Sequence, residues 1–291
     1  MTLVSPAVDA AVSGVLGLLI GSFLNVVIHR LPRMLEAEWA ANCAELAGAA
    51  PKAAEPFNLM RPRSRCQSCG HQIRWHENIP VLSYLLLRGK CARCTTRISI
   101  RYPIIEIVTA VFFAVAAANN GITLSGLAWA AFASLLITQF FIDFDTQLLP
   151  DDVNYLILWL GLVASAIGWT TVPLNSAVWG AVFGYLSLWT VYQVHHRLTG
   201  KQGMGHGDFK LLAALGAWFG AEYLVALILL SSVVGSIIGG TLLLVGKLSH
   251  RDMPIPFGPF LAGAGLLAMA AGPGRLETIA PFAFPFSQLA R

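Results

Sequence analysis

Two aspartates are candidates for acid–base chemistry, because each lies at the edge of an apolar stretch. Asp143 lies at the end of one apolar run, and Asp208 lies at the start of another, within the G-x-G-D element of residues 205–208. When two carboxylates approach closely, both cannot ionise, so one accepts a proton from water while the other, protonated, donates to a carbonyl oxygen. Such a pair would hydrolyse an amide without a covalent intermediate.

Asp143 is a better partner for Asp208 than its neighbour Asp145 is. Successive helix positions turn by about 100°, so residues two apart face nearly opposite directions, and Asp143 lies nearer the apolar run. On spacing alone, other interpretations stay open. Asp208 is also a good helix N-cap, Asp143 and Asp145 fit solvated loop acids, and a pair of acids in apolar surroundings is typical of a transporter's ion-binding site.

Four cysteines in two C-x-x-C pairs form a second candidate site. Cys66 and Cys69 are separated by 21 residues from Cys91 and Cys94, a gap slightly longer than that of zinc ribbons but compatible with a tetrahedral zinc site of four thiolates. A site closed by four thiolates is structural, because it leaves no open position for catalysis. Disulfides and an iron–sulfur cluster are the alternatives. Cys43 lies outside both pairs, and its role is open.

The composition indicates which elements must position these groups. Of the 291 residues, 56% are hydrophobic and only 12% are charged, and the mean hydropathy is +0.67. An ordinary soluble domain carries about 25% charged residues, so lipid must solvate much of the apolar surface. The sequence therefore predicts an all-α polytopic membrane protein and excludes a disordered chain, a collagen and a secreted disulfide scaffold.

We expect about eight transmembrane helices and a zinc-stabilised loop-domain. The first helix accounts for residues 1–28, the four-cysteine loop-domain for 29–102, and a membrane-embedded core of seven helices for 103–291. The apolar runs expected to form the helices are 8–28, 103–118, 124–142, 153–170, 174–192, 209–219, 222–246 and 258–272. The run at 209–219 is too short to cross a bilayer alone.

The basic residues predict the orientation of these helices. If the N-terminus is outside, the segments 29–102, 143–152, 193–208 and 247–257 are cytoplasmic, and together with Lys210 they contain seventeen of the nineteen Lys and Arg residues. The positive-inside rule therefore favours this topology. No basic residue precedes the first apolar run, unlike in a secretory signal peptide, so we expect a retained helix.

Several short motifs occur together in a fixed order along nearly the whole chain. They are Gly21-Ser22-Phe23-Leu24-Asn25 with Arg30-Leu31-Pro32, Glu77-Asn78-Ile79-Pro80-Val81-Leu82-Ser83-Tyr84 with Arg88-Gly89-Lys90-Cys91, Arg101-Tyr102-Pro103 with Glu106, the block from Asp143 to Asp151, Gly205-His206-Gly207-Asp208-Phe209-Lys210, and Pro256-Phe257-Gly258-Pro259. With these motifs, the chain resembles the type IV prepilin peptidases, a family of GxGD-type membrane aspartic proteases that includes bifunctional leader peptidase/N-methyltransferases.

The resemblance implies roles for both candidate sites. Asp143, upstream of the Leu-Pro-Asp element, and Asp208, in the GxGD motif, match the family's catalytic aspartates, and the four loop cysteines match its zinc site. The core 103–291 is then a peptidase core. The four-cysteine loop makes the chain similar to the bifunctional members, which also methylate. No G-x-G-x-x-G fingerprint is present in the sequence, so residues that bind the methyl donor are not identified.

The resemblance also implies substrates and a location. The family removes the leader of type IV prepilins and type II secretion pseudopilins after a glycine, at the cytoplasmic face, and then N-methylates the new N-terminal residue with S-adenosylmethionine. We therefore expect a multi-pass protein of the bacterial inner membrane, with a periplasmic N-terminus and with the zinc loop and active site facing the cytoplasm. The expected partners are these substrates and the lipid bilayer, with no nucleic acid.

Two other classes of function remain as alternatives. A zinc- or proton-coupled transporter would use the Asp pair for ion transfer, and an assembly factor would hold prepilins through the zinc loop without cutting them. Cleavage of a prepilin that depends on Asp143 and Asp208 separates the enzyme from both alternatives.

Overall fold

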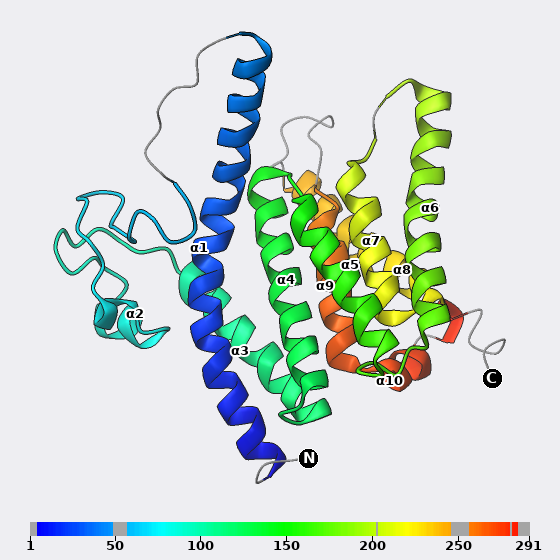
Figure 1. The fold of residues 1–291 in the computed structure, drawn as a ribbon, viewed down its shortest axis with the longest axis horizontal. Helices are drawn as coiled ribbons and strands as arrows, with labels where there is room; N and C mark the ends of the chain where they lie inside the picture. The colour runs from blue at the N-terminus through cyan, green and yellow to red at the C-terminus, as the bar shows by residue number, and fades with distance from the viewer. Residues whose placement is uncertain (1–4, 49–56, 202, 246–255, 280, 285–291) are drawn as a thin grey trace. The chain divides into compact units, whose positions relative to one another are not determined.

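The computed structural model describes residues 5–48, 57–201, 203–245, 256–279 and 281–284, most of which are helical (Figure 1). Within these ranges, β pairing is limited to two isolated bridges, Arg65 with Gln72 and Lys90 with Arg97. The chain divides into two compact units, Met1–Ile122 and Thr123–Arg291. The expected all-α fold class is confirmed.

The first unit consists of two long helices and the loop that joins them. Its elements are α1 (Pro6–Leu46), the 3-10 helix η1 (Trp75–Asn78), α2 (Leu82–Leu86) and α3 (Arg101–Asn120). Helix α1 begins where the side chain of Ser5 accepts the Val8 N–H and Pro6 occupies the first turn, both favourable features of a helix start.

Helices α1 and α3 pack antiparallel and very closely, because glycines lie at the interface. A Cβ atom on Gly17 would lie 2.7 Å from the Cα of Ala110, and one on Gly21 would lie 2.7 Å from the Cα of Glu106. Small residues allow this approach in membrane helices, where packing replaces the hydrophobic effect as the driving force. Farther along the same interface, Asn25 Nδ2 donates to the carbonyl oxygen of Tyr102 at 3.2 Å.

Both helices hold the connecting loop through buried polar side chains. From α1, the guanidinium of Arg30 donates to the carbonyl oxygens of Asn58 at 2.8 Å and Pro62 at 2.6 Å. From α3, the carboxylate of Glu106 accepts the backbone N–H of Val81 at 2.7 Å. The loop is therefore anchored on either side of its first cysteine pair.

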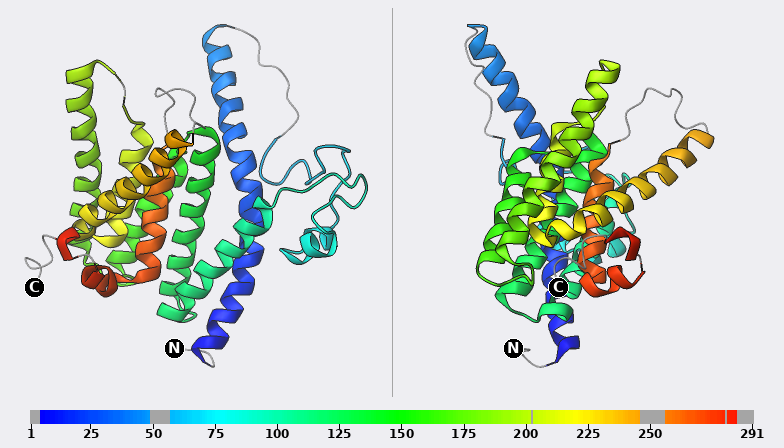
Figure 2. Two further views of the ribbon diagram at one scale, coloured as in Figure 1. Left: turned by 180° about the vertical axis from the view of Figure 1, so that it is seen from behind. Right: turned by 90° about the vertical axis from the view of Figure 1, so that its right-hand side faces the viewer.

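The second unit is a bundle of helices with a short central one (Figures 1 and 2). Its elements are α4 (Leu124–Thr146), α5 (Asp151–Ala166), α6 (Leu174–Thr199), α7 (His206–Phe219), η2 (Ala221–Tyr223), α8 (Leu224–Leu244), α9 (Gly258–Ala271), α10 (Pro273–Ile279) and η3 (Pro281–Ala283). Helix α7 packs against α5, α6 and α9, and α4 packs against α5 and α9.

The core of this unit is built around α7, whose side chains are almost all buried. The Trp218 ring lies 4.5 Å from that of Phe132, centroid to centroid, and its Nε1–H donates to the Ile157 carbonyl at 2.8 Å. Helix α6 comes so close that a Cβ on Gly216 would lie 2.1 Å from the Gly180 carbonyl oxygen. The first turn of α7 is thus held in place by dense packing beyond it.

Each of the eight predicted runs falls on a helix, from α1 and from α3 through α9. Among the described residues, four helical segments are long and apolar enough to cross a membrane, Pro6–Leu46, Arg101–Asn120, Leu124–Thr146 and Ala221–Thr241, and Gly258–Ala271 is shorter but apolar. Helix α7, with 14 residues, is about 21 Å long, less than the roughly 30 Å of a bilayer core. The protein is therefore a polytopic membrane protein, and the count of eight spans stays a prediction.

The structure differs from the sequence-based boundaries in two places. Helix α1 continues to Leu46 rather than ending near residue 28, and α3 belongs to the same compact unit as α1. The extension of α1 is rich in Ala, Glu and Leu, which favour a helix, but as a whole it is not apolar enough to extend a membrane run. The three-part division stays a prediction, and residues 247–255 of the last expected cytoplasmic segment lie outside the described residues.

Candidate active site and metal centre

Asp143 lies in the last turn of α4 and is buried, with 4% of its surface exposed. Helix α4 ends at Thr146, because Gln147 adopts a left-handed conformation (φ 55°) while its N–H donates to the Asp143 carbonyl at 2.9 Å. The backbone N–H of Gly258, at the start of α9, hydrogen-bonds the Asp143 carboxylate. Its Oδ2 atom is buried without a hydrogen-bond partner in the described part of the chain.

Asp208 lies in the first turn of α7 and is 6% exposed. The N-cap of this helix is Gly205, so the interpretation of Asp208 as a helix cap is wrong. The backbone N–H of Gly205 hydrogen-bonds the Asp208 carboxylate, and the positive end of the helix dipole favours a negative charge at this position. The Oδ1 atom of Asp208 is nevertheless buried and unpartnered among the described residues.

The two aspartates lie near one another in the second unit. Asp143 and Asp208 are close enough to interact electrostatically. The Leu149 side chain packs against Gly207, next to Asp208, and against Gly258, next to Asp143. A Cβ on Gly207 would lie 2.6 Å from Leu149 Cβ. A Cβ on Gly258 would lie 2.9 Å from Leu149 Cδ1 and 2.5 Å from Asp143 Oδ2. Larger residues at either glycine would displace this leucine or the carboxylate.

The other acids near Asp143 are in different surroundings. Asp145, Asp151 and Asp152 are exposed, and Asp151 Oδ2 lies 2.6 Å from Lys210 Nζ. Asp143 is therefore the buried acid of this segment, and the interpretation of it as a solvated loop residue is wrong.

The pair has the features of a site that acts on a polar group. Buried oxygens without partners are rare, because an unpaired buried polar group costs about 1–3 kcal/mol. One unpartnered oxygen on each acid leaves a hydrogen-bonding position that water or another polar group can take. A neutral carboxyl beside an ionised one can then donate one proton while its neighbour accepts another.

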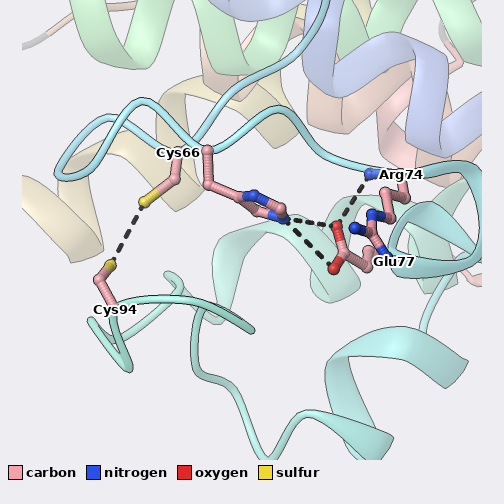
Figure 3. A network of polar contacts seen from close by, with 5 residues as sticks. Cys66, Arg74, Glu77 and Cys94 are labelled. Carbon is pink, nitrogen blue, oxygen red and sulfur yellow. Dashed lines mark hydrogen bonds and ion pairs between the residues drawn. The ribbon is translucent and has the colours of Figure 1, made fainter.

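The four cysteines of the loop come together as expected. Their Sγ atoms all lie within 4.8 Å of one another, and Cys66 Sγ is 3.8 Å from Cys94 Sγ (Figure 3). A zinc ion with Zn–S bonds of about 2.3 Å places its ligands roughly 3.8 Å apart. The cluster is therefore compatible with zinc.

Each cysteine pair is held by a turn of the same geometry. In the first, the Gly70 N–H donates to the Cys66 carbonyl at 2.9 Å, and in the second the Thr95 N–H donates to the Cys91 carbonyl at 3.0 Å. Both turn residues have positive φ angles, 69° and 58°. Glycine adopts this conformation freely, whereas Thr95 does so at a cost of roughly 1–2 kcal/mol.

The surroundings favour the thiolate at two of the four sulfurs, whereas burial and contacts with the other cysteines raise the pKa of Cys69 to about 11. Hydrogen bonds from the Thr96 hydroxyl and backbone amide lower the pKa of the Cys94 thiol to about 6, and the backbone amides of Cys69 and Ser68 lower the pKa of Cys66. Thiolates are the form that binds a metal ion. Cys43 lies in α1 as an exposed free thiol, apart from the cluster.

Next to the cluster, the Glu77 carboxylate is held in a polar network (Figure 3). It accepts the Arg74 backbone N–H at 2.8 Å and lies 3.0 Å from His71 Nε2. The Arg74 amide, together with His71, lowers the pKa of this carboxyl. These contacts connect the turn after the first cysteine pair to η1.

Two buried amides near the aspartates were not singled out by the sequence pattern. Gln139 and Asn154 form a hydrogen bond of 2.8 Å between α4 and α5. The signal that identifies Gln139 is its position one helical turn before Asp143, in an otherwise apolar helix. Asn154 likewise lies among apolar residues of α5, one turn after Pro150.

The fold and these two sites define a class: a polytopic helical membrane protein with a buried acid pair and a cysteine cluster suited to a metal ion. Comparison with known proteins identifies the family. Residues 15–120 match the bacterial peptidase A24 N-terminal domain, and residues 130–240 match the type IV leader peptidase family.

Similar proteins align over nearly the full chain. The chain is 49% identical to a prepilin leader peptidase/N-methyltransferase of Pseudomonas putida and 48% identical to that of Pseudomonas aeruginosa, over 92% of each chain in both cases. It is 49% identical to one of Neisseria gonorrhoeae over 89% of each chain. No solved structure matches the chain. The chain belongs to the prepilin leader peptidase/N-methyltransferase family, and it is a peptidase and methyltransferase of this family.

Neutralising one acid of the pair is expected to stabilise the fold. Asp208→Asn replaces one of two buried carboxyl groups, which cannot both ionise without mutual repulsion, by a neutral amide, so we expect the midpoint of thermal unfolding in detergent to rise, by roughly 2–4 °C for each kcal/mol gained. Differential scanning fluorimetry measures this shift. The control is Asp145→Asn, an exposed position expected to change the midpoint much less. A lower midpoint for Asp208→Asn than for this control contradicts the prediction.

Proposed function

We propose that this protein cleaves the leader of type IV prepilins and type II secretion pseudopilins after a glycine, at the cytoplasmic face of the inner membrane, and then methylates the new N-terminal amine. The names of its relatives support prepilin processing and methylation. The observation that carries the peptidase assignment is the pair of buried carboxylates at the ends of α4 and α7, each with an unpartnered oxygen.

In the proposed mechanism, Asp143 and Asp208 are the catalytic residues and share the acid and base roles. The ionised carboxylate accepts a proton from a water molecule while the water oxygen bonds to the scissile carbonyl carbon. The protonated carboxyl donates its proton to the carbonyl oxygen. The C–N bond then breaks as the acid that took the proton from water passes it to the leaving nitrogen, and a hydroxyl of the tetrahedral intermediate returns a proton to the other acid. Either acid fits either role, because both are buried and each lies beside a backbone N–H donor.

The proposed substrate suits the position of the pair at helix ends. A prepilin is itself an apolar helix preceded by a basic leader, so it would arrive laterally through lipid with its leader in water. Because Asp143 closes α4 and Asp208 opens α7, we propose that both lie at the cytoplasmic edge of the membrane, where the scissile bond would be. The distribution of basic residues supports this orientation.

We propose that Cys66, Cys69, Cys91 and Cys94 hold a structural zinc ion. Support comes from their mutual distances and from the hydrogen bonds that favour thiolates. The ion would fold the loop between α1 and α3, whose described part is too polar to build a core of its own.

We propose S-adenosylmethionine as the methyl donor, on the strength of the N-methyltransferase names of the relatives. A bound donor would supply an electrophilic methyl group to the new N-terminal amine. No G-x-G-x-x-G fingerprint occurs in the sequence, and no group of described residues is assigned to the donor.

Loss of either acid is expected to abolish cleavage. Purified protein is incubated with a prepilin and isotopically labelled S-adenosylmethionine, and the product mass is read. Wild type should remove the leader and add one methyl group, whereas Asp143→Ala and Asp208→Ala should cut at least about 10²–10⁴-fold more slowly, the usual contribution of acid–base catalysis.

The control in this experiment is Asp145→Asn, which should be milder than Asp143→Asn because Asp145 is exposed. The reverse ranking would show that the catalytic acid was wrongly assigned. Ion transport by the protein in liposomes, with prepilin left intact, would instead favour a transporter, and binding of prepilin without cleavage by wild type would favour an assembly factor.

Removal of one thiolate is expected to empty the metal site. Wild type should purify with about one zinc ion per chain, and Cys66→Ser should lose it and impair methylation, as measured by elemental analysis and methyl incorporation. Cys43→Ser is the matched control, because this exposed cysteine lies in α1 outside the cluster. Equal zinc content in Cys66→Ser and Cys43→Ser would disprove the assignment.

A further inference from the structure

A chain of buried side-chain amides joins the two helices that carry the aspartates. Gln139 on α4 is fully buried, and Asn154 on α5 is 1% exposed. Gln139 Nε2 donates to Asn154 Oδ1 at 2.8 Å and to the Pro150 carbonyl at 3.2 Å. Asn154 Nδ2 in turn donates to the Gly207 carbonyl at 3.4 Å.

The two ends of this chain adjoin the aspartates. Gln139 precedes Asp143 by four residues on α4, so the two side chains lie on the same helix face, one turn apart. Gly207 is directly bonded to Asp208. The path therefore runs from the last turns of α4, through the start of α5, to the peptide group that precedes Asp208.

We propose that Gln139 and Asn154 are positioning residues of the peptidase, which set the placement of Asp208 relative to Asp143. This inference rests on the proposed catalytic roles of the two acids. The amides do not touch the reacting atoms in this account. They act on the Gly207 carbonyl and so on the backbone that carries the Asp208 side chain.

The stability of the fold alone is a weak reason for amides at these two buried positions. An apolar pair of the same size would fill the space without burying polar groups, and buried polar pairs are often no more stabilising than apolar ones. The Oε1 atom of Gln139 is itself buried without a partner in the described part of the chain. Unlike an apolar contact, a hydrogen bond is directional. The hydrogen-bonded pair can therefore fix the relative positions of the neighbouring ends of α4, α5 and α7.

The ion pair between the starts of α5 and α7 does not replace this link. Lys210 Nζ and Asp151 Oδ2 are 2.6 Å apart, but the side chain of Asp151 is 51% exposed. Exposed ion pairs contribute little and tolerate rearrangement. The buried path through Asn154 therefore provides the stricter constraint on Gly207.

The test measures steady-state kinetics of prepilin cleavage for Gln139→Met and Asn154→Leu, which keep approximate size and remove the amides. We expect kcat per folded molecule to fall by about 10²-fold, the effect of a small misplacement of a reacting group, with KM changed by less than about twofold because neither amide contacts the substrate. The double variant should be no slower than the slower single variant, because both changes break one path.

Matched controls remove buried hydroxyls from the same helices. The Thr138 hydroxyl on α4 donates to the Ser134 carbonyl of its own helix, and the Ser165 hydroxyl on α5 donates to the Val172 carbonyl, away from the aspartates. Thr138→Val and Ser165→Ala should keep the wild-type kcat. Gel filtration and thermal unfolding give the folded fraction of every variant, and Asn154→Ser provides a second route if Asn154→Leu does not fold.

The outcomes separate this inference from the proposed function. If wild type cleaves prepilin and Asp208→Asn does not, but Gln139→Met and Asn154→Leu keep the wild-type kcat, the positioning role is overturned and the catalytic pair stands. The inference is also overturned if the fold-decreases in kcat of the two single variants multiply in the double variant. It is likewise overturned if these decreases are no larger than those of Thr138→Val and Ser165→Ala. Failure of wild type to cleave prepilin overturns both.

Discussion

The burial of two carboxyl groups near one another, which cannot both ionise without mutual repulsion, is the constraint on which the second unit depends. Asp143 and Asp208 interact electrostatically, and each carries a buried oxygen without a partner. Such an arrangement costs free energy, so the surrounding structure must impose it. The dense packing of α7, fixed by Trp218 and by close contact with α6, provides the rigidity that holds one acid in place.

Backbone geometry supplies the rest of the constraint. The left-handed Gln147 ends α4 just after Asp143, and Gly205 and Gly258 present backbone N–H groups to the two carboxylates. These donors partly replace the water that burial removes, which keeps a charged form accessible. At the same time, Gly207 and Gly258 leave space for Leu149, so an apolar side chain closes the region between the helix ends. A site of this kind combines low polarity with fixed hydrogen-bond donors, which suits the proposed acid–base catalysis.

Much of the fold follows from local sequence patterns. The remaining features are set by contacts between segments that are distant in the sequence. Apolar runs predict helices because a chain in lipid must satisfy its own backbone, and paired cysteines predict their own cluster. The helical extension of α1 to Leu46 lacks an apolar signal, and the pairing of Gln139 with Asn154 depends on how α4 and α5 pack. The left-handed conformation of Thr95 is likewise imposed by the second cysteine turn rather than by the preference of threonine.

The most direct test of the account is the proximity of the two acids in the folded protein. In a Cys43→Ser background with zinc bound, Asp143→Cys with Asp208→Cys should be joined by a short bifunctional thiol reagent, seen as a single intramolecular adduct by mass spectrometry. Asp145→Cys with Asp208→Cys, in which the exposed neighbour replaces the buried acid, should not be joined. Equal cross-linking of the two pairs, or none in the first, would contradict a shared site formed by Asp143 and Asp208.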